Sequence, residues 1–178
     1  MNKKAIIYGV AAGLVVSVIT LLAYLTDKSL LANWWFGMIM LPIPVIAMVM
    51  AGIAIRKEKG SLPFGEAFLN TFITGIVFSA VSVIFQILLY HAIDPELPAY
   101  LMEKAMENTA AMMEKFGVPE SQMDVAMEEA AKSINDAFTI GNQLMSVLWS
   151  AIIWGIVALI IAAIIKRNPE TNTTSLDS

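Results

Sequence analysis

The chain contains four apolar runs, and each is long enough to cross a lipid bilayer as a helix. They extend over about residues 5–25, 34–55, 66–91 and 144–165, and a spanning helix needs about 20 consecutive apolar residues. Hydrophobic residues make up 58% of the sequence, against about 45–50% in a typical soluble domain. We therefore predict an all-α polytopic membrane protein, with four transmembrane helices bundled in a single membrane domain over residues 1–167.

A polar insert, residues 94–137, separates the third run from the fourth. Gly117 and Pro119 interrupt two helical patterns within it, because glycine commonly stops a helix and proline suits a first helical position. We expect a helical hairpin of about Pro98–Phe116 and Pro119–Ala137. The apolar face of the first helix is wider than that of the second, so the second helix can cover only part of it. The remainder predicts a further contact with the membrane, the spans or another copy.

Charge is distributed unevenly along the chain. The insert contains ten of the fifteen acidic residues: Asp94, Glu96, Glu103, Glu107, Glu114, Glu120, Asp124, Glu128, Glu129 and Asp136. Basic residues near span ends fall mainly on the other side of the predicted membrane: Lys3, Lys4, Arg56, Lys57, Lys59, Lys166 and Arg167. Because basic residues favour the cytoplasm, we predict cytoplasmic termini, an external hairpin and, after Arg167, a disordered polar tail over 168–178.

Small and polar residues recur at helical spacing and predict how the spans pack. Gly9, Gly13 and Ser17 share one face of the first span, and Gly75 and Gly155 lie in the third and fourth spans. Such residues let helices approach closely. The third span also has a polar stripe, which should face other helices: Thr71, Gly75, Ser79, Ser82 and Gln86. Pro42 and Pro44 should kink the second span.

Few residues suggest chemistry. Glu66 lies in the first turn of the third helix, where the helix dipole, with Arg56 and Lys57 as possible partners, explains a carboxylate more simply than ion coupling does. His91 lacks an identifiable nucleophile or orienting partner. Gln86, Asn142 and Gln143 are near the outer ends of their helices, where they could hydrogen bond to one another. The chain has no cysteine. We therefore predict no enzymatic activity, no cofactor and no metal.

The hairpin itself allows two ligand hypotheses. Met102 with Met106, and Met123 with Met127, have the i, i+4 spacing at which two thioethers could share a Cu(I) or Ag(I) ion, although methionine at this spacing is more often a core filler. Acidic residues such as Glu103 and Glu107 could hold a hard cation or dock a basic partner. A solvated acidic face is the simpler interpretation.

Two short motifs are similar to those of a known family. The segment SLPFGEAFLNTFITG and the pattern H-x-x-D-P-E, together with four spans and a Met/Glu-rich hairpin, resemble the bacterial family catalogued as domain of unknown function 4199. The resemblance covers Lys4 to about Arg167. It implies this architecture and a bacterial inner-membrane location, supplies no catalytic residue, and strengthens Gly65, Glu66 and Asp94 as candidate functional positions.

The leading functional hypothesis is a non-enzymatic interaction, assembly or accessory protein. Its expected partners are the lipid bilayer, a second copy or another membrane protein, and a basic partner on the acidic hairpin, with no nucleic acid. The alternative is a small oligomeric transporter or ion-handling protein that uses Glu66 and the polar face of the third span.

Overall fold

The computed structural model describes residues 2–167, apart from the side chains of residues 120–122. The predicted disordered tail lies outside the described residues. The chain forms α1 (Lys3–Thr26), a short 3-10 turn η1 (Lys28–Ala32), α2 (Trp34–Met40), α3 (Pro42–Lys59) and α4 (Phe64–Leu88). A π-helical turn η2 (Leu89–Ile93) extends α4, and α5 (Leu97–Lys115), α6 (Glu120–Ala137) and α7 (Ile140–Ile165) follow.

Four helical segments are long and apolar enough to cross a membrane: Lys3–Thr26, Trp34–Lys59, Phe64–Ile93 and Ile140–Ile165. The α5–α6 hairpin lies between the third and fourth, so the predicted fold class is confirmed. The fourth helix begins at Ile140 rather than near residue 144, since the Thr139 side chain caps it by accepting a bond from the backbone N–H of Asn142. The second segment breaks between Met40 and Pro42, where the prolines predict a kink.

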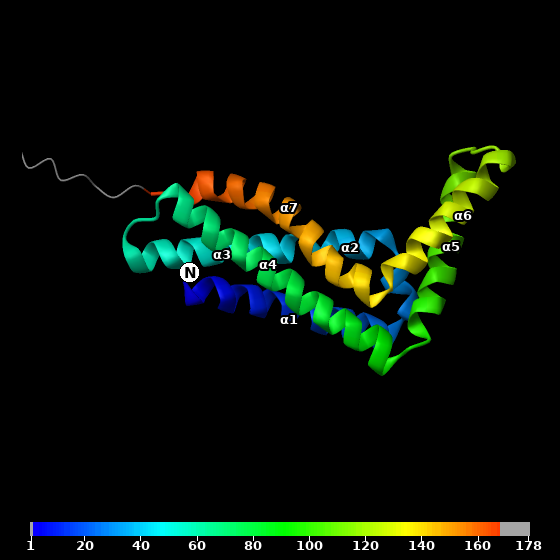
Figure 1. Cartoon of the computed structure of the whole chain (residues 1–178), viewed down its shortest axis with the longest axis horizontal. Coiled ribbons are helices and arrows are strands. Elements are labelled where there is room, and N and C mark those ends of the chain that lie inside the picture. Colours follow the sequence, from blue (N-terminus) through cyan, green and yellow to red (C-terminus); the bar gives the residue numbers. More distant parts are fainter. Residues whose placement is uncertain (1, 168–178) are drawn as a thin grey trace, which may run out of the picture.

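The long helices run side by side, and the hairpin projects from one end of the bundle (Figure 1). At the opposite end lie the start of α1, the α3–α4 connection and the end of α7. Helix α4 packs against α1, α3 and α7 and is the centre of the bundle. Thr71, Gly75, Ser79 and Ser82 are buried, so this part of the polar stripe faces other helices as predicted, whereas Gln86 at its end is only partly buried. Asn70 and Thr74 of the same helix are buried as well.

Glycines on α1 allow close contact with α4. A Cβ built on Gly9 would lie 2.7 Å from the carbonyl oxygen of Thr74, and one on Gly13 would lie 2.6 Å from Cβ of Val81. Ser17, one turn further along α1, is buried and donates to the Gly13 carbonyl at 2.8 Å. The face of α1 that contacts α4 therefore has almost no side-chain atoms, and such faces let helices pack closely in lipid.

The contact between α4 and α7 centres on Trp154. Its ring lies against Gly75, where an added Cβ would be 2.8 Å from Cγ of the indole. The indole Nε1 donates to Oγ of Ser79 at 2.7 Å, and the ring meets Phe78 edge to face at 5.7 Å. Gly155, by contrast, has room, since the nearest atom to an added Cβ is in Phe72 at 3.9 Å.

Candidate functional site

The root of the hairpin is tied to the bundle by Asp94. Its Oδ2 accepts hydrogen bonds from the Tyr24 hydroxyl at 3.0 Å and from Lys28 Nζ at 2.6 Å. The Asp94 side chain is only 13% exposed, although it lies in the connection between η2 and α5. The aspartate thereby joins the exit of the third span to the end of the first span and the loop after it.

Electrostatics at this junction favour the ionised pair. The ammonium group of Lys28, and next the Tyr24 hydroxyl, hold the pKa of Asp94 below its ordinary value against the opposing effect of desolvation. Hydrogen bonding to Asp94 raises the pKa of Lys28 in return. Both groups are therefore charged across the neutral pH range, and the contact is charge-assisted.

A small apolar cluster surrounds the same junction. Leu89, Leu97 and Leu101 are buried and pack with aromatic residues that include Tyr24, Phe85, Tyr90 and Phe138. Helix α5 also contacts η1, and Asn108 Nδ2 donates to the carbonyl of Ala32 at 3.4 Å. The further contact predicted for the first hairpin helix is thus made, near its root, by the chain that connects the first two spans.

The outer part of the hairpin is exposed and acidic. Glu103 and Glu107 are both exposed, and only Glu107 forms an ion pair, with Lys104 at 2.7 Å. Within residues 2–167, no other acidic side chain described on α5 or α6 has a salt-bridge partner. His91 is exposed in the π turn. The four methionines at i, i+4 spacing are partly buried, and the copper hypothesis for them stays untested.

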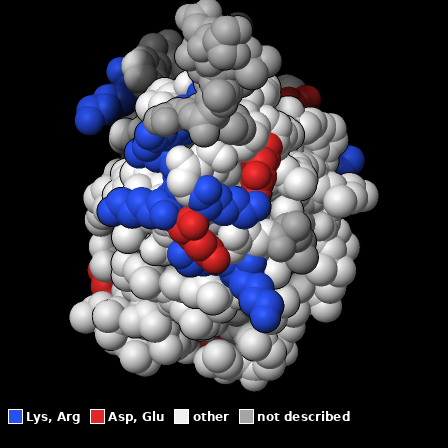
Figure 2. Space-filling model, turned by 90° about the vertical axis from the view of Figure 1, so that its left-hand side faces the viewer, with Lys and Arg blue, Asp and Glu red and all other residues white. Residues whose placement is uncertain are grey.

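Glu66 lies at the other end of the bundle and pairs with Lys59, so the expected pairing with Arg56 or Lys57 is wrong. Arg56 instead donates from Nη1 to the Ile165 carbonyl at 3.2 Å, which satisfies the end of α7. Figure 2 shows basic side chains gathered on this end of the molecule, with acidic side chains among them. Gly65 is open, with no atom within 4 Å of an added Cβ.

The polar stripe of α4 is used inside the bundle. Thr71 and Thr74 donate to the carbonyls of Ala67 and Asn70 at 2.8 and 2.9 Å. Asn70 donates to the Glu66 carbonyl and accepts from the backbone N–H of Asn2 at 3.0 Å. The threonine hydroxyls are thus satisfied within α4 itself, and Asn70 ties α4 to the start of α1 through the backbone of Asn2.

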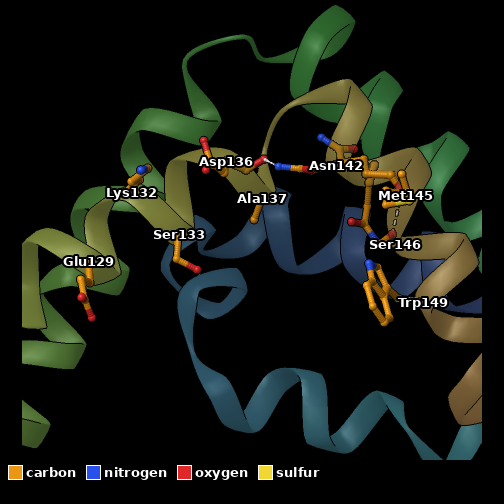
Figure 3. Close-up of a pocket in the computed structure, with 11 residues that line it drawn as sticks. Glu129, Lys132, Ser133, Asp136, Ala137, Asn142, Met145, Ser146 and Trp149 are labelled. Carbon is orange, nitrogen blue, oxygen red and sulfur yellow. Dashed lines mark hydrogen bonds between the residues drawn. The ribbon is translucent and has the colours of Figure 1, made fainter.

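Gln86, Asn142 and Gln143 come together but do not hydrogen bond to one another, contrary to expectation. Asn142 Nδ2 donates to the carbonyl of Asp136 at 2.9 Å, and Gln143 Nε2 donates to that of Phe138 at 2.8 Å. The N–H groups of both amides are thus satisfied by backbone carbonyls at the α6–α7 connection. All three residues line a cavity between the hairpin and α7 (Figure 3).

These features define a class: a multi-pass helical membrane protein with an acidic helical hairpin whose root packs on one end of its bundle. Residues 7–167 match the model of the family described as "Protein of unknown function (DUF4199)", and the chain belongs to that family. No curated protein and no solved structure matches the chain. The family resemblance inferred from the residues is thereby confirmed.

Proposed function

We propose that this protein is a non-enzymatic accessory protein of the bacterial inner membrane, which docks a basic partner protein on its external acidic hairpin. The observation that supports this most is the contrast between the two parts of the hairpin. Its root is held by buried leucines and the Asp94 ion pair, whereas its acidic side chains are exposed and mostly unpaired within the described residues.

Such an arrangement suits recognition. Exposed carboxylates keep their hydration until a partner arrives, and they attract a positive surface over about a Debye length, roughly 10 Å at 0.1 M salt. A fixed root removes part of the ordering cost of binding. The excess of basic residues at the opposite end of the bundle supports cytoplasmic termini and an external hairpin.

The proposal is tested by photo-crosslinking in membranes that contain the full chain. A photoreactive residue replaces Ala111, which is exposed on α5 one turn from both Glu107 and Glu114. We expect a covalent adduct whose crosslinked peptide from the partner is rich in Lys and Arg. Raising the salt to 1 M, where the Debye length is about 3 Å, should decrease the adduct.

Charge variants should change the yield of the crosslinked adduct in opposite directions. Glu103→Lys combined with Glu114→Lys should nearly abolish the adduct, and Lys115→Glu should increase it, because all three residues are exposed and none is in a salt bridge within the described residues. A photoreactive residue at Leu148, 66% exposed on the apolar side of α7, is the control site. Equal adducts from all the charge variants would contradict the proposal.

The transport alternative has less support. Asn70, Thr71, Thr74 and Ser79 are engaged within the bundle, and Glu66 pairs with Lys59 at the end of its helix. Ion flux in proteoliposomes that falls in Glu66→Gln and Gln86→Leu variants would revive it.

A further inference from the structure

A cavity of about 670 Å³ lies where the second hairpin helix meets the fourth span. In Figure 3 the labelled side chains of α6 lie on one side of it and those of α7 on the other. The hydrogen bond from Asn142 to the Asp136 carbonyl joins the two helices at the closed end, and Gln86 of α4 contributes to the lining. This space is separate from the outer acidic surface of α5.

One residue in the lining of the cavity has an unsatisfied acceptor. Gln143 is 4% exposed, and its Nε2 donates to the Phe138 carbonyl at 2.8 Å. That bond determines the orientation of the amide, since the reverse orientation would place two acceptor oxygens together. Oε1 is buried and has no hydrogen-bond partner within the described residues. A buried acceptor calls for a donor, so a ligand here should carry an N–H or O–H group.

The wall formed by α6 is charged. Glu129, Lys132, Ser133 and Asp136 line the cavity, and their spacing of three, four and seven residues places them on one helix face. None of the three charged side chains has an ion-pair partner within residues 2–167. Two carboxylates and one ammonium group complement a ligand that carries both a positive and a negative charge, with the positive group favoured.

The wall formed by α7 leads to the bilayer. Met145 and Trp149 line the cavity and are 49% and 67% exposed. Leu148, Ile152 and Ile156 continue the exposed apolar surface along the same span. Tryptophan is enriched where a span meets the lipid headgroups. The cavity therefore has a polar wall on the hairpin and an apolar border shared with lipid chains.

We propose that this cavity binds the phosphoethanolamine headgroup of a phospholipid from the leaflet on the hairpin's side. The primary ammonium group is received by Asp136 and donates to Oε1 of Gln143, and Glu129, two turns back on the same wall, adds negative charge to it. The phosphate pairs with Lys132, and the acyl chains lie along the apolar surface of α7 beyond Trp149. A choline headgroup has no N–H for Gln143, and an anionic glycerol headgroup meets two carboxylates, so the site discriminates between headgroups.

The test is native mass spectrometry of the full-length protein titrated with ethanolamine, choline and glycerol phospholipids of identical acyl chains. We expect the ethanolamine lipid to bind about tenfold more tightly than the choline lipid, which corresponds to about 1.4 kcal/mol. Asp136→Asn and Glu129→Gln, both at exposed side chains, should each reduce this preference, and Gln143→Leu should abolish it. Glu103→Gln, on the exposed face of α5, is the matched control and should bind as the unmodified protein does.

Equal binding of ethanolamine and choline lipids would overturn the proposal, as would a preference that survives in the Glu129, Asp136 and Gln143 variants alike. Free O-phosphoethanolamine is the arm that separates a lipid from a soluble ligand. It should compete only weakly, because it lacks chains to contact α7. Competition as strong as that of the intact lipid would overturn the assignment to the bilayer.

Discussion

Replacing Gly13 by alanine tests the close contact between α1 and α4. The added methyl carbon would lie 2.6 Å from both Cβ and Cγ1 of Val81, whereas unstrained carbon atoms approach to about 3.5–4.0 Å. Because Cβ of Val81 is fixed to the backbone, rotation of the side chain cannot remove the overlap. The two helices must separate by about 1 Å, and overpacking of this kind costs about 1–3 kcal/mol.

The opposing effect is helix propensity, which favours alanine over glycine by about 1 kcal/mol. Gly155→Ala is the matched control, since it gains the same propensity on α7 while its new methyl group stays 3.9 Å from the nearest atom, in Phe72. The difference between the two variants removes the propensity contribution. We expect Gly13→Ala to be less stable than Gly155→Ala by about 1–3 kcal/mol.

The measurement is reversible unfolding in mixed micelles with increasing dodecyl sulfate, followed by helix content and tryptophan fluorescence. Of the four tryptophans, Trp154 is buried against α4 and the other three are exposed, so the change in emission on unfolding should come mainly from Trp154 and report on the packing of the bundle. Gly9→Ala should behave like Gly13→Ala, because its methyl group would meet the Thr74 carbonyl oxygen at 2.7 Å. If the Gly13 and Gly155 variants differ by less than about 0.5 kcal/mol, the normal scatter of harmless substitutions, the proposed close contact is refuted.

Three further predictions concern single contacts. Ser79→Ala leaves the Trp154 indole N–H without its acceptor and should cost about 0.6–1.7 kcal/mol in the same unfolding assay. Leu101→Ala, at a side chain only 3% exposed, should cost about 2–5 kcal/mol and increase proteolysis of α5 before the bundle unfolds. The lowered pKa of Asp94 makes its pairing with Lys28 stabilising above the ordinary aspartate pKa of about 3.9. That stabilisation is lost as pH falls through the lowered value, so proteolysis at the hairpin root should rise in acid for the unmodified protein and be less dependent on pH for Asp94→Asn.

The spans and the hairpin could be predicted because their determinants are local. Run length and helical periodicity depend on neighbours in sequence, and Gly117 adopts a φ of 68°, the left-handed conformation that suits its place at the end of α5. The Asp94 contact is different. Its partners Tyr24 and Lys28 are 70 and 66 residues away, and the pairing depends on which loops meet at the end of the bundle. Local sequence patterns do not show which loops come into contact there.

The wrong partner for Glu66 has a specific cause. Helix α3 continues to Lys59, and Gly60, at a φ of 75°, closes it with an N–H bond to the Arg56 carbonyl at 3.0 Å. That turn brings Lys59 to the first turn of α4, while Arg56 faces the end of α7. The spacing of charges in the sequence does not show which basic residue pairs with Glu66, because the pairing depends on the direction that the chain takes after α3.

The hairpin is best understood as an extension of the bundle rather than as a separate domain. A segment of this size rarely forms an independent core. The buried leucines of α5 pack in a cluster that includes Tyr24 of α1 and Leu31 of η1. Movement of the hairpin relative to the spans would have to break that cluster and the Asp94 ion pair together. A partner held by α5 would therefore be kept at a fixed position above the first and third spans, and a lipid bound beside α7 would lie at the base of the same support.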